Sequence, residues 1–175
     1  MDDPDLLEPD AEVIEPKLDG STLSIGIAVA RYNEFITTHL LNACQRQLHG
    51  HGVIDEKVTI AWVPGAMELP ITARELIASR DVDAVVCLGC IIRGETSHYD
   101  HVAQESARGI ARVALDTGTP VIYGIVTAET LAQAIDRSGA RAGNRGGDAG
   151  LAAIEMARVL ASIREGPSVG TRDPS

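Results

Sequence analysis

The chain has 175 residues, which is enough for one well-buried domain and short for two, and with 3 % aromatic residues its core must be built from Val, Ile, Leu and Ala. The net charge is −10, yet eight of the 25 acidic residues and one of the 15 Lys and Arg lie in residues 1–20, so the remainder carries only −3. Because no basic patch with interleaved aromatic residues occurs, the composition argues against a nucleic-acid partner.

The N-terminal part of the chain predicts an extension followed by a strand and a helix. Residues 1–20 hold prolines among acids, cannot bury much apolar surface, and are expected to form a mobile acidic extension. Residues 23–30, LSIGIAVA, form the first expected strand. After Asn33, apolar residues at helical spacing predict a helix with one apolar stripe, made of Phe35, Ile36, Leu40, Leu41, Cys44 and Leu48.

The middle of the chain predicts two more strands, each followed by a helix. Residues 57–63 form the second expected strand, and the next helix is expected from near Pro70 to about Ser79. The apolar run 84–88, which Gly89 closes, is typical of a strand buried on both faces of a parallel sheet. A polar loop and an amphipathic helix follow, and the inward face of that helix consists of Val102, Ser106, Ile110 and Val113.

The C-terminal part of the chain predicts a fourth strand and two helices. Residues 120–125, PVIYGI, form the strand, and Thr127 lies ahead of a short helix that contains Ala134. A glycine-rich segment, 138–147, leads to the last helix. Residues 166–175 are expected to form a loose tail. The last helix is expected to direct four side chains toward the sheet, namely Leu151, Ile154, Val159 and Ile163.

Strands that alternate with helices predict a single-domain, three-layer α/β/α fold with a four-stranded parallel sheet, spanning residues 21–165, because each parallel connection needs a crossover. In such sheets ligands bind beyond the carboxyl ends of the strands. Polar side chains follow all four strands, and a helix start there suits an anion such as phosphate. With His98 a few residues away, this edge indicates acid–base chemistry on a phosphorylated small molecule.

The three cysteines are odd in number and lack the spacing of a disulfide framework. Cys87-Leu-Gly-Cys90 matches C-x-x-C, but redox pairs begin a helix and Cys87 lies within a predicted strand. His98-x-x-His101 has the spacing of half a metal site, but no convincing further ligands accompany it. We therefore expect ordinary thiols and no metal. An acidic N-terminus and the lack of a membrane-length apolar run predict neither signal peptide nor anchor, hence a cytoplasmic enzyme.

Six segments, taken in order and spacing, carry a family resemblance over about residues 23–160. They are VARYN, WVPGAMELP, LGCIIRGETSHYDHV, YGIVT, AIDRSG and AGNRGGDA. The combination resembles lumazine synthase, the transferase family of the penultimate step of riboflavin biosynthesis. VPGAMELP together with IRGETSHYD is too long a joint match to arise by chance.

The resemblance implies a flavodoxin-like fold and a reaction without metal or organic cofactor. In that reaction 5-amino-6-(D-ribitylamino)uracil and 3,4-dihydroxy-2-butanone 4-phosphate condense to 6,7-dimethyl-8-ribityllumazine and phosphate. It also implies a homopentamer with active sites at subunit interfaces, and riboflavin synthase as a candidate partner. Some members pack pentamers into icosahedral shells by laying an N-terminal strand, here residues 13–18, along a neighbour. Pro16 weakens that strand, so whether this chain forms a shell stays open.

The resemblance also assigns roles to residues. Proton transfer falls to His98, and Tyr32 stands where the family places Phe or Trp, so it can stack on a pyrimidine ring. Arg93 is expected to be structural, and Arg145 stands where Lys is usual. The ribitylaminouracil site would consist of Tyr32, Ala66, Met67, Glu68, Cys90, Ile91, Ile92 and, from the neighbouring subunit, Tyr123. The butanone phosphate would be bound by the main chain of Glu95 and Thr96 and by the guanidinium of Arg137.

Two other classes of protein are built on the same kind of parallel sheet. One is a non-catalytic flavodoxin-like ligand-binding module, and the other is a receiver-like or nucleotide-binding domain. The first strand is followed neither by a glycine fingerprint nor by an acidic pair that would hold a metal and a phosphoacceptor, which disfavours the second class. Incubation with the two substrates separates the enzyme from the binding module.

Overall fold

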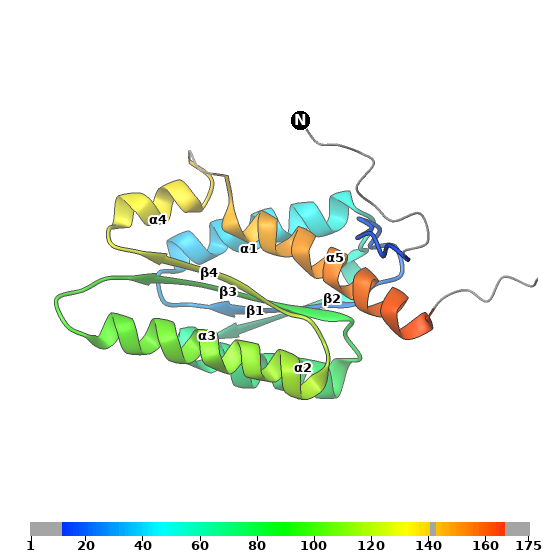
Figure 1. Cartoon of the computed structure of the whole chain (residues 1–175). Coiled ribbons are helices and arrows are strands. Elements are labelled where there is room, and N and C mark those ends of the chain that lie inside the picture. The colour runs from blue at the N-terminus through cyan, green and yellow to red at the C-terminus, as the bar shows by residue number, and fades with distance from the viewer. Residues whose placement is uncertain (1–11, 141–142, 167–175) are drawn as a thin grey trace, which may run out of the picture.

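A computed structural model describes residues 12–140 and 143–166. Its centre is one sheet of four parallel strands in the order β2-β1-β3-β4, as Figure 1 shows. This confirms the predicted flavodoxin-like α/β fold. The strands are β1 (Ile25–Ala30), β2 (Val58–Val63), β3 (Ala84–Ile92) and β4 (Val121–Ala128).

Helices cover both faces of the sheet, so the molecule has three layers. In Figure 1, α1, α4 and α5 lie on one face, and α2 and α3 lie on the other. Every parallel connection passes through such a helix, which is the crossover that parallel pairing requires. The helices are α1 (Glu34–Gly50), α2 (Leu69–Arg80), α3 (His98–Thr117), α4 (Leu131–Arg137) and α5 (Arg145–Glu165), and two short 3₁₀ turns are η1 (Asp55–Lys57) and η2 (Ala66–Glu68).

The core lies on both sides of the sheet, and β1 divides it. All six residues of β1 are buried, and their side chains alternate between the two faces. Ile27 and Val29 belong to the cluster beneath α1 and α5, whereas Ala28 and Ala30 belong to the cluster beneath α2 and α3. A strand covered on both faces needs a continuous apolar run, which explains the sequence IGIAVA.

Strand β3 is longer than the sequence predicted. We expected it to end at Leu88, but it continues to Ile92. The reason is its neighbour, because β4 also extends beyond the predicted end at Ile125 and pairs with β3 residue for residue up to Ala128. Gly89 lies inside this ladder opposite Ile125 and does not end the strand. Residues 90–92 are therefore held by the sheet rather than by a loop.

Two apolar side chains predicted to point inward are exposed. Phe35 is 65 % exposed because its neighbour Ile36 occupies the inward face of α1. Ile163 is 54 % exposed near the end of α5. The inward face of α5 is built mainly from small residues, which allow the helix to approach α1 and the sheet closely: Gly146, Gly147, Ala149, Gly150, Ala153, Ile154 and Ala157.

The predicted extension (1–20) and tail (166–175) fall largely on residues outside the described part of the chain. Residues 12–19 are described, are exposed and have no regular secondary structure. The strand proposed for residues 13–18 concerns a neighbouring subunit and stays a prediction. Among the described residues, no helix is long and apolar enough to cross a membrane.

Candidate active site

A cavity of about 470 Å³ lies at the carboxyl edge of the sheet. It is lined by the ends of β1, β2 and β3 and by the start of α3, at the edge where the sequence predicts the site. Nine of the twelve predicted site residues line it, namely Tyr32, Ala66, Met67, Glu68, Cys90, Ile91, Ile92, Thr96 and His98.

The turn after β1 presents Tyr32 to the cavity, and this residue is 73 % exposed. Two groups hold this turn. The backbone N–H of Tyr32 donates to the carbonyl of Pro64 at 3.1 Å. Asn33 adopts a left-handed conformation with φ 60° and donates from Nδ2 to the carbonyl of Cys90 at 2.9 Å. The turn is thus fastened to both neighbouring strand ends, which leaves the aromatic ring free for a ligand.

The 3₁₀ turn after β2 forms a second wall. Ala66 is buried, while Met67 and Glu68 are exposed. The Glu68 carboxylate lies over Gly65, where an added Cβ would be 3.3 Å from Oε2. Its backbone carbonyl accepts a hydrogen bond from Thr72 Oγ1 at 2.8 Å, which fixes the turn at the start of α2. The carboxylate can therefore accept hydrogen bonds from hydroxyl groups of a ligand.

The end of β3 forms the floor. Cys90 is 3 % exposed, and burial raises the pKa of its thiol to about 11. Burial also raises the pKa of Cys87 to about 12. A redox C-x-x-C pair needs the opposite shift. These shifts agree with the interpretation of both residues as ordinary buried thiols.

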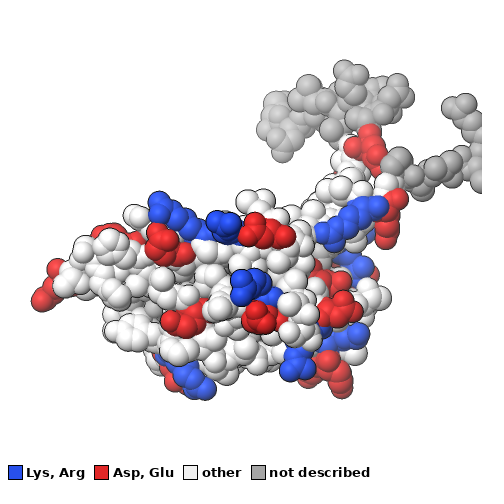
Figure 2. Space-filling model, turned by 90° about the horizontal axis from the view of Figure 1, so that it is seen from below, with Lys and Arg blue, Asp and Glu red and all other residues white. Residues whose placement is uncertain are grey.

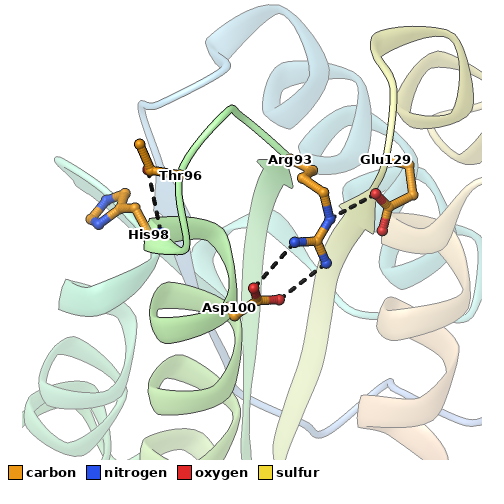
Figure 3. Close-up of polar contacts among 5 residues, drawn as sticks. All are labelled: Arg93, Thr96, His98, Asp100 and Glu129. Atoms are coloured by element: carbon orange, nitrogen blue, oxygen red, sulfur yellow. Dashed lines mark hydrogen bonds and ion pairs between the residues drawn. The ribbon is translucent and has the colours of Figure 1, made fainter.

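The connection from β3 to α3 forms the third wall, and Thr96 and His98 line the cavity from it. His98 is the first residue of α3, and its backbone N–H lies 3.4 Å from Thr96 Oγ1 (Figure 3). The first N–H groups of a helix have no partner within the helix. In this described segment, Ser97 at the N-cap makes no side-chain hydrogen bond to them. The N–H of Asp100 donates to the carbonyl of Ser97 at 3.1 Å and that of His98 contacts Thr96, which leaves the N–H groups of Ser97 and Tyr99 in this described segment for an anion such as phosphate.

Three of the predicted site residues do not line the cavity of their own chain. Glu95 is exposed between two lining residues, Gly94 and Thr96. Tyr123 is half-buried in β4, where burial raises the pKa of its phenol and a hydrogen bond with Ser106 partly offsets that rise. Arg137 is exposed at the end of α4, on the opposite face of the sheet from α3. The roles assigned to all three stay predictions.

Sequence reasoning missed five lining residues. All five lie within the motifs WVPGAMELP and LGCIIRGETSHYDHV, which also contain most of the residues that it identified. The signal was their position shortly after a strand end or near a helix start. They are Pro64, Gly65, Gly94, Tyr99 and Val102.

A second hollow of about 510 Å³ is lined by Phe35, His39 and residues around Asn144. It contains none of the twelve predicted site residues. Within residues 12–140 and 143–166, no three His, Cys, Asp or Glu side chains are arranged to hold a metal ion.

Charged side chains of both signs are scattered over the face that α2 and α3 cover (Figure 2). Several form ion pairs along α3, such as Arg108 with Glu105 at 2.7 Å and Arg112 with Asp116 at 3.2 Å. This mixture resembles an ordinary solvated surface rather than a single-sign binding patch.

The fold and the cavity together define a flavodoxin-like α/β protein with a cavity at the carboxyl edge of its sheet, where such folds bind small molecules. Residues 22–161 match the family model described as 6,7-dimethyl-8-ribityllumazine synthase. The chain therefore belongs to this family, as the six segments predicted. At the level of the family, it is a transferase of riboflavin biosynthesis.

Proposed function

We propose that the protein condenses 5-amino-6-(D-ribitylamino)uracil with 3,4-dihydroxy-2-butanone 4-phosphate and releases 6,7-dimethyl-8-ribityllumazine and phosphate. The observation that carries this proposal is the cavity itself. Nine residues to which the family resemblance assigns a role line one cavity of about 470 Å³, although they come from three separate segments of the chain. That volume lies within the range of cavities that enclose small ligands.

The pyrimidine ring would bind against Tyr32, whose exposed aromatic face offers offset stacking. The buried end of β3 would meet the edge of the ring with backbone groups of residues 90–92. Glu68, exposed on the opposite wall, would accept hydrogen bonds from the ribityl hydroxyls. The first substrate thus contacts the ends of β1, β2 and β3.

The phosphate of the second substrate would bind at the start of α3. Main-chain N–H groups of Glu95, Thr96 and the first turn of the helix favour a dianion. A guanidinium can complete such a site with two parallel hydrogen bonds. Because Arg137 lies outside the cavity of its own chain, we propose that a neighbouring subunit supplies it, as the resemblance implies for Tyr123.

The reaction requires only bond changes that proton transfer assists. The 5-amino nitrogen attacks the ketone carbon, and water leaves as the imine forms. C3 of the butanone then loses a proton, and phosphate leaves from C4 with the C–O bonding electrons. The resulting enol takes up a proton at C4 and becomes a ketone at C3. The ribityl-bearing nitrogen attacks this new carbonyl carbon, and loss of a second water closes the ring. His98 at the rim would exchange protons with these oxygens. Holding both reactants side by side supplies much of the acceleration.

Incubation of the purified protein with both substrates tests the proposal. We expect mass spectrometry to detect the lumazine, together with one inorganic phosphate for each product molecule. A chelator should leave the rate unchanged, because no step calls for a metal. Binding of the ribitylaminouracil without any product would contradict the proposal and favour a ligand-binding module. Loss of activity with a chelator and its restoration by zinc would contradict the cofactor-free scheme.

A further inference from the structure

The connection from β3 to α3 carries Thr96 and His98, yet it has little support of its own. Residues 93–98 are all exposed. Within the described residues, the side-chain contact inside this loop is the 3.4 Å approach of the His98 N–H to Thr96 Oγ1. The other two walls of the cavity are fastened to neighbouring strands by shorter hydrogen bonds. Something else must hold this loop if it is to place a phosphate and an imidazole accurately.

Arg93 spans the loop from its first residue. Its backbone N–H donates to the carbonyl of Ala128 at 2.9 Å, which anchors residue 93 to the end of β4. Its guanidinium reaches across to the first turn of α3, where Nη1 and Nη2 donate to the two oxygens of Asp100 at 3.1 and 3.0 Å. Nε donates to Glu129 Oε2 at 2.7 Å. Figure 3 shows this network on the side of the helix start away from His98.

The same guanidinium also contacts a wall of the cavity. Its Cζ atom lies 4.2 Å from the centre of the Tyr99 ring, and that ring lines the cavity. Arg93 itself does not line it. The side chain therefore meets the cavity only indirectly, through the loop and through Tyr99.

The hydrogen-bond geometry of Arg93 is suited to holding the loop in one position. Isolated ion pairs between exposed side chains contribute little to stability. Here, however, the planar guanidinium of Arg93 donates two parallel hydrogen bonds to Asp100 and a third, from Nε, to Glu129. A lysine ammonium cannot reproduce this arrangement. The hydrogen bonds from Arg93 hold the pKa of Asp100 below its usual range, so the pair is charged at neutral pH. The network therefore links the start of the loop to the first turn of α3 and to the residue after β4.

We propose that Arg93 is a positioning residue that fixes the β3–α3 loop, and with it Thr96, Tyr99 and His98, against the end of β4. This inference rests on the proposed function of the cavity. It predicts an effect on one substrate only, because the loop belongs to the phosphate end, whereas Tyr32 and Glu68 stand on other walls.

The test compares Arg93→Gln with Arg112→Gln. Arg112 forms a more exposed ion pair on α3, with Asp116 at 3.2 Å, and lies outside the cavity, so its variant removes the same charge without touching the loop. We expect Arg93→Gln to raise the KM for the butanone phosphate and to lower kcat, with kcat/KM falling on the order of ten- to a hundredfold. The KM for the ribitylaminouracil should stay unchanged. Arg93→Lys should recover less than half of the decrease in log(kcat/KM), because a lysine cannot donate two parallel hydrogen bonds to Asp100.

Hydrogen exchange gives a readout that does not depend on activity. The backbone amides of residues 94–99 should exchange faster in Arg93→Gln than in Arg112→Gln, while the remaining amides exchange alike. Equal exchange in the two variants would overturn the inference, as would a lower melting temperature with both KM values and kcat unchanged. If the unmodified protein makes no product, the proposed function fails, and the exchange measurement still decides whether Arg93 orders the loop.

Discussion

At the scale of single residues, the position of His98 determines what its imidazole can do. It is the first residue of α3 and lines the cavity, beside the backbone N–H groups of the helix start. His101 follows three residues later and does not line the cavity. Two histidines on one exposed helical turn therefore have different expected roles, and this difference allows a matched comparison.

We predict that His98→Ala lowers kcat by about a hundredfold, near the low end for loss of an acid–base group, because the attacking amine is already nucleophilic and both substrates still bind. Both KM values should change little. His101→Ala, which removes an exposed imidazole from the same turn, should retain nearly full activity. Steady-state kinetics of the two variants measure this. Equal losses in the two would show that His98 has no specific role.

The thiols give a second prediction at this scale. Burial raises the pKa of Cys44 and Cys87 to about 12 and that of Cys90 to about 11. Because the thiolate is the reactive form, a raised pKa lowers reactivity at pH 8, and reactivity returns only as the pH approaches these values. A colourimetric disulfide reagent should find no fast thiol at pH 8 in the native protein and three in denaturant. A fast thiol in the native protein would show that Cys90 is open to the cavity.

At the scale of elements, the alternation of strands and helices was predictable because each buried strand is an apolar run and each helix has a periodic face. The positions at which β3 and β4 end were not predictable from the sequence. Gly89 resembles a strand terminator in the sequence, but its partner Ile125 continues the ladder beyond it. Where these strands end is decided by pairing between residues that are distant in the chain, and the local sequence does not show this pairing. The same limit applies to the site, since Tyr99 becomes a wall only after the loop has folded.

The contact between α1 and α5 leads to a prediction about stability. A Cβ added at Gly146 would overlap the backbone carbonyl of Leu40, so Gly146→Ala must push the two helices apart. We expect the free energy of unfolding to fall by about 1–3 kcal/mol. Gly50, the last residue of α1, has open space around it, and Gly50→Ala should stabilise the protein by about 0.4–1 kcal/mol. Denaturant midpoints of both variants measure this, and equal midpoints would contradict the close contact.

At the scale of the whole molecule, the cavity of one chain is incomplete for the proposed reaction. Its lining residues include an imidazole and a carboxylate but no Lys or Arg. The guanidinium assigned to the phosphate, that of Arg137, lies on the opposite face of the sheet from α3. We propose that a homopentamer brings Arg137 and Tyr123 of one subunit to the cavity of the next.

Mixed oligomers test this arrangement. Arg137→Ala and His98→Ala should each be nearly inactive. If they are denatured and refolded together, about a quarter of the sites should combine an intact His98 with an intact Arg137 from the next subunit, because closed rings repeat one heterologous contact. Activity should recover to about that fraction. If both residues acted within one chain, refolding the mixture would recover none.

The most direct test of the account is a structure of the protein with the ribitylaminouracil and inorganic phosphate bound. We predict the pyrimidine ring against Tyr32, the ribityl chain toward Glu68, and phosphate at the start of α3 within reach of His98. A pyrimidine bound elsewhere, for example in the hollow lined by Phe35 and His39, would contradict the assignment of the active site.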